Sequence, residues 1–192
     1  MQTEIKSDEL ERFNLFFPGT WITGPDRNKA IETQLTLEHI EAAFIEAVTA
    51  FSLFKPITDV TAMEDLKIQK SRYECCLNTL YAKAFVYSLD AIEKLLCVLG
   101  RAPNAPAAIQ GLLQEYGKYF GHLKHIRDSA IHVEDRGRCR TRKQARIKSN
   151  LLILGGFIGA PVANRFSYTG ENGRTYEVEF SDATLLCAHK IL

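Results

Sequence analysis

Residues 77–99 read LNTLYAKAFVYSLDAIEKLLCVL, and their apolar side chains recur every three or four positions. The same pattern extends upstream to about Thr61, and Gly100 suits the C-terminal end of a helix. This period predicts an amphipathic α-helix over residues 61–99 with one broad apolar stripe. At about 1.5 Å per residue the helix would be near 58 Å long, so we allow for a kink between Gln69 and Arg72.

Two further helices flank this one in the sequence. A helical period begins at Thr36 and ends before Pro56, and another opens at Asn104 and stops near Gly137. The short connection after Gly100 predicts that helices 61–99 and 104–136 form an antiparallel hairpin. We expect residues 1–35 to be an irregular arm with one short helix.

The C-terminal part has a different pattern. Residues 164–168 and 175–180 alternate polar and apolar side chains around a turn with Asn172-Gly173, which is typical of a β-hairpin. Ser181 can cap a short closing helix, whereas periodicity leaves the type of residues 151–158 open. The predicted fold class is therefore mainly α: an antiparallel helical bundle built on a long helical hairpin, with a small C-terminal β-hairpin and closing helix. We divide it into an arm (1–35), a bundle (36–143) and a C-terminal unit (144–192) packed on the same domain.

Composition limits the kinds of function. The 192 residues suit one domain, and a formal net charge of +1 means that any attraction to nucleic acid must be local. No run of about 18 apolar residues occurs, and the first residues do not resemble a signal peptide, so we expect a cytoplasmic protein without a membrane span. The five cysteines are odd in number and form no C-x-x-C pair, so neither disulfides nor structural zinc are expected.

Residues 125–136, HIRDSAIHVEDR, hold the chain's main ionisable cluster. They place Arg127, Asp128 and His132 near the end of the third predicted helix. A basic run without acidic residues follows, comprising Arg136, Arg138, Arg140, Arg142, Lys143, Arg146 and Lys148. An ionisable cluster beside a polycationic segment indicates RNA as the partner before a small metabolite.

These residue types suit phosphodiester cleavage. A histidine with a pKa near about 6.5 can transfer protons at the ribose 2′-OH and the leaving oxygen, while an arginine holds the phosphate. Asp128 stands one turn before His132 and could orient its ring. On a regular helix, however, Arg127 and His132 lie about 140° apart, so something must bring them together.

The pattern of Arg127, a polar residue directly after it, and His132 at the end of a helical hairpin resembles the HEPN superfamily. The likeness covers about residues 36–136, with Asp128 where the family most often has Asn. It implies a metal-independent endoribonuclease without cofactors, in which a homodimer forms a composite site from two copies of the motif. The implied catalytic residues are Arg127, Asp128 and His132.

The resemblance also implies a setting and contacts. Such nucleases tend to serve prokaryotic defence or toxin–antitoxin systems, where an antitoxin or another protein is a partner. His125 and Ser129 share a helical stripe with Asp128 and His132, so we expect them to contact RNA together with Arg136, Arg138, Arg140, Arg142 and Lys143.

Other interpretations stay open. The same helices could form a non-catalytic module that dimerises or binds a nucleotide, RNA or a protein. Arg127 would then only complement the charge at the C-terminal end of its helix, or pair with Glu134. The basic run could be a solvated loop. The spacing of His122, His125 and His132 is a poor metal-ligand set, and the isolated pair Gly155-Gly156 does not support a phosphate-binding loop.

Overall fold

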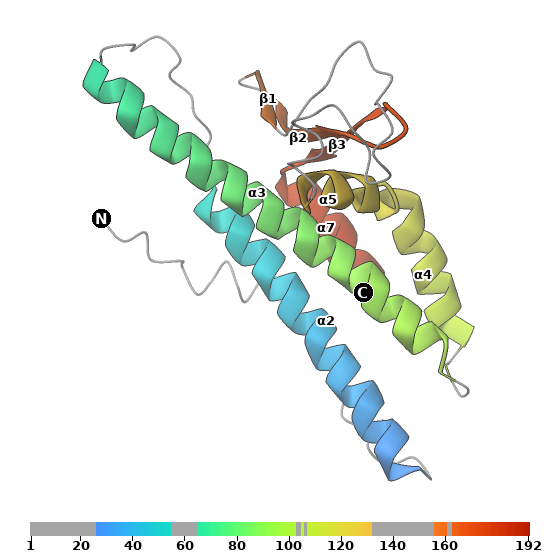
Figure 1. The fold of residues 1–192 in the computed structure, drawn as a ribbon. Helices are drawn as coiled ribbons and strands as arrows, with labels where there is room; N and C mark the ends of the chain where they lie inside the picture. Colours follow the sequence, from blue (N-terminus) through green and yellow to red (C-terminus); the bar gives the residue numbers. More distant parts are fainter. Residues whose placement is uncertain (1–25, 55–64, 103–104, 106, 132–155, 161–162) are drawn as a thin grey trace.

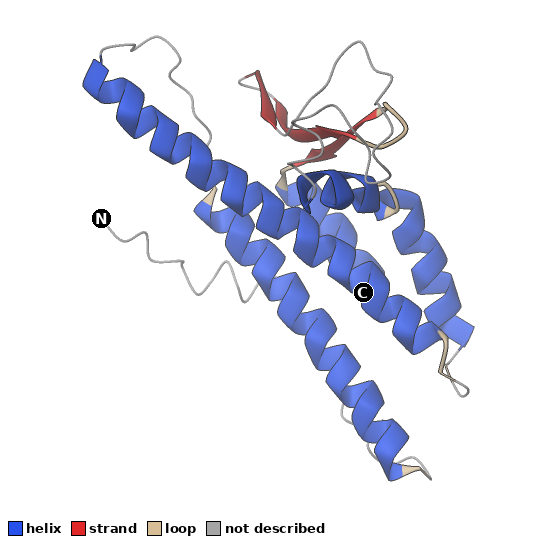
Figure 2. Ribbon diagram, in the orientation of Figure 1, coloured by secondary structure: helices blue, strands red, loops and turns tan. Residues whose placement is uncertain are grey.

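The computed structural model describes residues 26–54, 65–102, 105, 107–131, 156–160 and 163–192, with side chains left out at 65–72, 75 and 156–163 (Figure 1). Its elements are α2 (Arg27–Leu53), α3 (Asp65–Gly100), α4 (Ala107–Phe120), α5 (Leu123–Ile131), β1 (Gly156–Ala160), β2 (Ala163–Thr169), β3 (Thr175–Glu179) and α7 (Asp182–Ile191). The predicted fold class is confirmed, because helices dominate and the small sheet is antiparallel (Figure 2).

The two longest helices, α2 and α3, pack along each other. Phe44 of α2 and Phe85 and Leu89 of α3 are fully buried in the same core. Helix α2 begins earlier than the periodicity predicts, so the expectation of irregular structure is wrong for residues 27–35. The reason is Asp26, whose side chain accepts a hydrogen bond from the Lys29 backbone N–H at 3.2 Å and caps the helix.

Helix α3 is one continuous α-helix of 36 residues. It includes residues 69–72, so the kink that we allowed for is not present. This stretch contains neither Pro nor Gly, the usual causes of a sharp bend. The unbroken helix gives the molecule a long axis, against which α4 runs back as the predicted antiparallel partner (Figure 1).

The third predicted helix is broken into α4 and α5 by a turn at Gly121-His122. A single helix over residues 104–136 is therefore the wrong prediction. At the break the Gly121 N–H donates to the Gly117 carbonyl at 3.0 Å, and a Cβ atom on residue 121 would lie only 2.6 Å from that oxygen. The turn redirects the chain, so Arg127 and Asp128 lie on the separate nine-residue helix α5.

The C-terminal sheet has the order β1-β2-β3. The predicted hairpin is confirmed: Phe166 pairs with Val178 and Tyr168 with Tyr176, and Gly173 adopts a φ of 76° in the turn. The ambiguous segment 151–158 becomes a strand from Gly156 onward, while residues 151–155 lie outside the described ranges.

Helix α7 closes the fold as predicted. The Ser181 hydroxyl accepts a hydrogen bond from the Thr184 N–H at 3.3 Å and caps the helix. Just before this cap, the Phe180 ring packs 4.4 Å from the Phe54 ring and 4.5 Å from the Phe85 ring, between ring centroids. The residue that follows β3 is thus packed into the core between α2 and α3.

Candidate functional site

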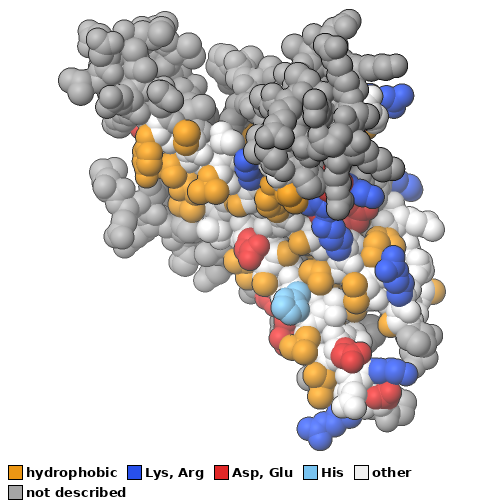
Figure 3. Space-filling view, viewed as in Figure 1, with side chains coloured by type: hydrophobic (Ala, Val, Ile, Leu, Met, Phe, Trp, Pro, Cys, Tyr) orange, Lys and Arg blue, Asp and Glu red, His pale blue; other side chains and the backbone are white. Residues whose placement is uncertain are grey.

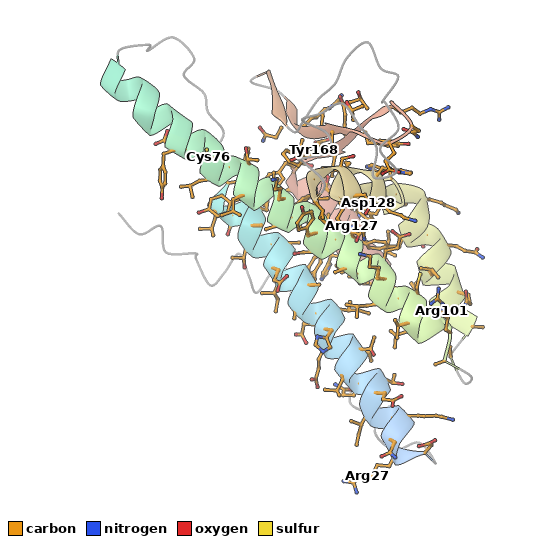
Figure 4. All side chains as sticks on the ribbon, viewed as in Figure 1. Arg27, Cys76, Arg101, Arg127, Asp128 and Tyr168 are labelled. Atoms are coloured by element: carbon orange, nitrogen blue, oxygen red, sulfur yellow. The ribbon has the colours of Figure 1, made fainter. Side chains whose placement is uncertain are left out.

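The candidate site is centred on Arg127, which α5 presents toward α3 (Figure 4). Its guanidinium lies between two carboxylates: Nη1 donates to Asp90 of α3, and Nε and Nη2 donate to Oδ1 of Asp128 at 3.0 and 2.5 Å. The Arg127 side chain is 14% exposed, that of Asp90 3% and that of Asp128 40%. The group is therefore closed on the α3 side and open near Asp128.

Asp90 is the buried centre of this group. Its Oδ2 atom also pairs with Lys94 Nζ at 2.6 Å, one turn further along α3. Burial raises the pKa of the Asp90 carboxyl, and the nearby Arg127 opposes that rise without cancelling it. Burial and the charge of Asp90 also raise the pKa of Glu93. Sequence analysis missed Asp90, although a carboxylate within the apolar stretch AFVYSLDAI is a signal that could have marked it.

Tyr87 of α3 lies near Arg127, and Tyr168 of β2 lies near Tyr87. Burial raises the pKa of Tyr168 to about 12, and the neighbouring Tyr87 makes a smaller contribution in the same direction. Burial also raises the pKa of Tyr87, against the opposing effect of Arg127. Both phenols therefore remain neutral at physiological pH and can act only as hydrogen-bonding groups. Tyr168 comes from β2, so within the described residues the sheet reaches this group only through Tyr87.

The other residues predicted on α5 have separate environments. Ser129 is fully buried, and its hydroxyl donates to the Thr169 carbonyl of β2 at 2.9 Å, so here it joins α5 to the sheet. His125 is exposed and stacks on the Tyr176 ring with centroids 4.4 Å apart and an interplanar angle of 20°. Burial lowers the pKa of His122, while a hydrogen bond with the Glu177 backbone opposes that shift. An RNA contact of His125 stays a prediction, whereas the fully buried Ser129 presents no surface to RNA in this structure.

Several predicted site residues lie outside the described residues. These are His132 and the basic residues Arg136, Arg138, Arg140, Arg142 and Lys143. The described part of α5 ends at Ile131, directly before His132. The structure therefore does not test the distance between Arg127 and His132, nor the proposed contact between Asp128 and His132.

Within the described residues, no three His, Cys, Asp or Glu side chains gather in a way that could hold a metal ion. Among the same residues, every helix is too short or too polar to cross a bilayer. Cys76, Cys97 and Cys187 are free thiols on helices.

The hydrogen bonds of Arg127 define what the site can do. A guanidinium has five N–H donors, and three of them are used by Asp90 and Asp128. The other two make no hydrogen bond with any residue that the structure describes. Arg127 is thus fixed in position, and within the described part of the chain it has two donors left for an anion, while its charge and that of Lys94 together balance the two carboxylates.

Comparisons of the chain with protein-family models, with curated proteins and with solved structures find no match.

Proposed function

We propose that this chain is a metal-independent endoribonuclease of the HEPN type. One observation carries the proposal: Arg127, first of the three motif residues, is held between Asp90 and Asp128 in the middle of α5, and two of its N–H donors have no partner among the described residues. Preorganised donors of this kind can stabilise the charge that develops on a phosphodiester in the transition state. His132 and the basic residues follow directly in the sequence.

In the proposed reaction each residue has one role. His132 removes the proton of the ribose 2′-OH, which attacks the phosphorus, and the His132 imidazolium then gives the proton to the leaving 5′-oxygen as its bond to phosphorus breaks. Arg127 binds the non-bridging phosphate oxygens. Asp128 holds Arg127 through Oδ1, and its second oxygen can accept a hydrogen bond from His132. The products are a 2′,3′-cyclic phosphate and a 5′-hydroxyl.

The proposal includes a homodimer, because Arg127 and His132 would not share one face of a regular helix and a second copy can complete the site. RNA is the substrate, with the segment from Arg136 to Lys143 drawing it in by charge. A cytoplasmic defence or toxin–antitoxin role, with a protein antitoxin as partner, extends the same proposal.

A specific observation favours a second candidate function, a non-catalytic binding module. Arg127 is paired with two carboxylates, and Asp90 is paired in turn with Lys94, so these four side chains carry no net charge. A balanced, mostly buried group of this kind is also typical of an ion network that fixes one helix on another. In that case the exposed stack of His125 on Tyr176 is a candidate surface for a base or another planar partner.

The decisive experiment is incubation of a mixed RNA pool in EDTA with the wild-type chain, Arg127→Ala, Arg127→Lys and His132→Ala. Arg165→Ala is the matched control, because Arg165 is an exposed arginine on β2 that pairs with Glu177 at 3.4 Å. We expect cleavage by the wild type and the control, with 2′,3′-cyclic ends, and a loss of about a hundredfold or more in the Arg127→Ala and His132→Ala variants.

Equal cleavage by every variant would overturn the assignment of the site. If no sample cleaves RNA but the wild type binds it more tightly than the Arg127 variants, the binding module is the better description. Thermal melts of each variant separate a chemical loss from unfolding, and Arg127→Lys keeps the charge if the alanine variant does not fold.

A further inference from the structure

Two stacked aromatic rings lie at the surface where α5 meets the sheet. The imidazole of His125 on α5 and the phenol ring of Tyr176 on β3 have centroids 4.4 Å apart and planes inclined by 20°, so the rings are nearly parallel. Tyr176 is half-buried, whereas His125 is exposed. Each ring of such a stack covers one face of the other, so the exposed part of His125 is its outer face.

The turn of the β-hairpin holds the Tyr176 ring in place. The Asn172 amide donates to the Tyr176 hydroxyl at 2.6 Å, and Oδ1 of Asn172 accepts a hydrogen bond from the Arg174 backbone N–H at 3.0 Å. The Asn172 side chain is thus fixed by the backbone and fixes the phenol in turn. A stack that is already ordered loses little conformational entropy when a ligand is added to it.

Gly170 leaves room for the same ring. A Cβ atom on residue 170 would lie only 2.7 Å from Cε2 of Tyr176, well inside the contact distance of two carbon atoms. Among the glycines that the structure describes, only Gly173 has a positive φ. The close approach of the Tyr176 ring, and not the backbone conformation, therefore requires a glycine at position 170.

Exposed cations flank the two rings in the sequence. Lys124 directly precedes His125, and Arg174 precedes Tyr176 by two positions; both side chains are exposed. Figure 3 shows Lys and Arg side chains around the end of the molecule that carries α5 and the sheet. An aromatic surface with cations beside it has the two components that bind single-stranded nucleic acid.

We propose that the His125–Tyr176 stack is a binding site for an unpaired nucleobase of single-stranded RNA. The base stacks on the outer face of His125 and extends the column of two rings to three. Every base has a π-face, and histidine and aromatic side chains stack on unpaired bases in RNA-binding proteins. Lys124 and Arg174 attract the phosphates that flank the base. A duplex keeps its bases stacked on one another, so the site selects single strands.

The stack is separate from the Arg127 group. His125 and Arg127 are two positions apart on α5, so they point about 160° apart around the helix. The inference rests on the proposed function only for its ligand, RNA, and not on cleavage. Cleavage without stacking at His125 would leave the proposed function standing and overturn this inference, and stacking without cleavage would do the opposite.

The first test measures binding to RNA that cannot be cleaved. A labelled oligonucleotide of about 12 adenosines with 2′-O-methyl groups lacks the nucleophile, and its abasic counterpart has the same phosphates without bases. By fluorescence anisotropy we expect His125→Leu to weaken binding of the adenosine oligonucleotide about tenfold and His125→Phe to restore it. Neither variant should change binding of the abasic oligonucleotide. His39→Leu is the matched control, because His39 is an exposed histidine on α2.

Three results would overturn the proposal. An equal loss of binding for both oligonucleotides would mean that His125 contacts the RNA backbone. A failure of His125→Phe to restore binding would mean that the imidazole nitrogens, and not the ring face, bind RNA. Unchanged binding by His125→Leu would leave the stack as a structural contact between α5 and β3. Thermal melts confirm that each variant is folded.

The second test observes the ring directly by NMR. A base stacked on His125 shifts the ring protons of this histidine upfield, and the His125 signal is identified by its absence from the spectrum of His125→Phe. We expect the shift with the single-stranded adenosine oligonucleotide and not with the same strand in a duplex, while the His39 signal stays in place. An unshifted His125 signal at saturating single strand would overturn the proposal, whether or not the chain cleaves RNA.

Discussion

The carboxylate of Asp90 on α3 and the guanidinium of Arg127 on α5 form an ion pair that fixes the short α5 helix on the long hairpin. Both side chains are mostly buried, and they lie 37 positions apart in the sequence. Helix α5 follows a turn at its start. Within the described residues, a hydrogen bond from Ser129 to the sheet also holds α5 in place. The pair is therefore a determinant of stability whatever its role in function.

Removal of either partner should destabilise the protein strongly. We expect Asp90→Ala to lower the free energy of unfolding by about 2–4 kcal/mol, because it leaves Arg127 buried with only Asp128 as partner. Arg127→Ala should cost a similar amount, and the double variant less than the sum, with a coupling energy of about 1–3 kcal/mol. Urea denaturation of the wild type, the two single variants and the double variant measures the free energies of this double-mutant cycle.

The control for this cycle is the exposed pair of Arg165 and Glu177, where the expected coupling is below about 1 kcal/mol. Additive losses at Asp90 and Arg127 would contradict the interpretation that the two charges compensate each other.

The burial of Asp90 also predicts a pH dependence. Its carboxyl has a raised pKa in the folded state, chiefly through burial, so the folded chain holds this proton at pH values where the unfolded chain has lost it. The contribution of Asp90 to stability therefore falls as the pH rises from the ordinary aspartate pKa of about 3.8 through the raised folded value. Asp90→Asn removes this titration.

The stability difference between wild type and Asp90→Asn should consequently shift in favour of the variant as the pH rises from about 4 to 6. Urea titrations of both proteins at each pH measure this difference. A difference that is constant over that range would mean that Arg127 cancels the effect of burial on Asp90, and one that moves toward the wild type would mean that Arg127 outweighs it.

Periodicity was sufficient for the elements that bury one continuous stripe. The hairpin helices, the strands on either side of Asn172-Gly173 and the helix capped by Ser181 all follow local rules of helix and turn formation. Those rules failed at Gly121, where the apolar period continues through the break. A tight turn at a glycine changes direction without interrupting the spacing of Phe120 and Leu123, which are both buried.

The candidate site was predictable only in part. Arg127 and Asp128 stand out because they are adjacent to each other in a polar segment. Asp90 joins them from a distant part of the chain, and no local pattern links α3 to α5. Long-range pairing of this kind depends on how α5 packs on α3, and the spacing of residues along the sequence does not reveal that packing.

His122 predicts the opposite pH response to Asp90. Burial lowers the pKa of His122 in the folded state, so the unfolded chain binds this proton first as the pH falls. Stability is then lost below about pH 6.5, the ordinary value for histidine. We expect His122→Gln, which keeps a side-chain donor, to reduce the loss of stability between about pH 7 and 5 in thermal melts. An unchanged slope would exclude His122 as its source.

Ser129 should matter for stability and not for cleavage. Ser129→Ala removes the hydrogen bond to the Thr169 carbonyl and should lower the free energy of unfolding by about 1–2 kcal/mol. The hydroxyl is fully buried, so the rate of RNA cleavage per folded molecule should not change. A large loss of cleavage with normal stability would instead place Ser129 in the RNA site.

The break at Gly121 provides a test with an internal control in the same helix region. A Cβ atom at residue 121 would lie 2.6 Å from the Gly117 carbonyl oxygen, whereas one at Gly117 or Gly111 has nothing within 4 Å. Gly117→Ala and Gly111→Ala should therefore stabilise the protein by about 0.5–1 kcal/mol, because alanine favours the helix. Gly121→Ala should destabilise it, because the turn must shift and α5 moves with it.

Since α5 carries Arg127, we also expect RNA cleavage to fall in Gly121→Ala but not in Gly117→Ala. Equal stabilisation by all three substitutions in urea denaturation would show that the chain tolerates a continuous helix through residue 121, and that the turn does not determine where Arg127 lies.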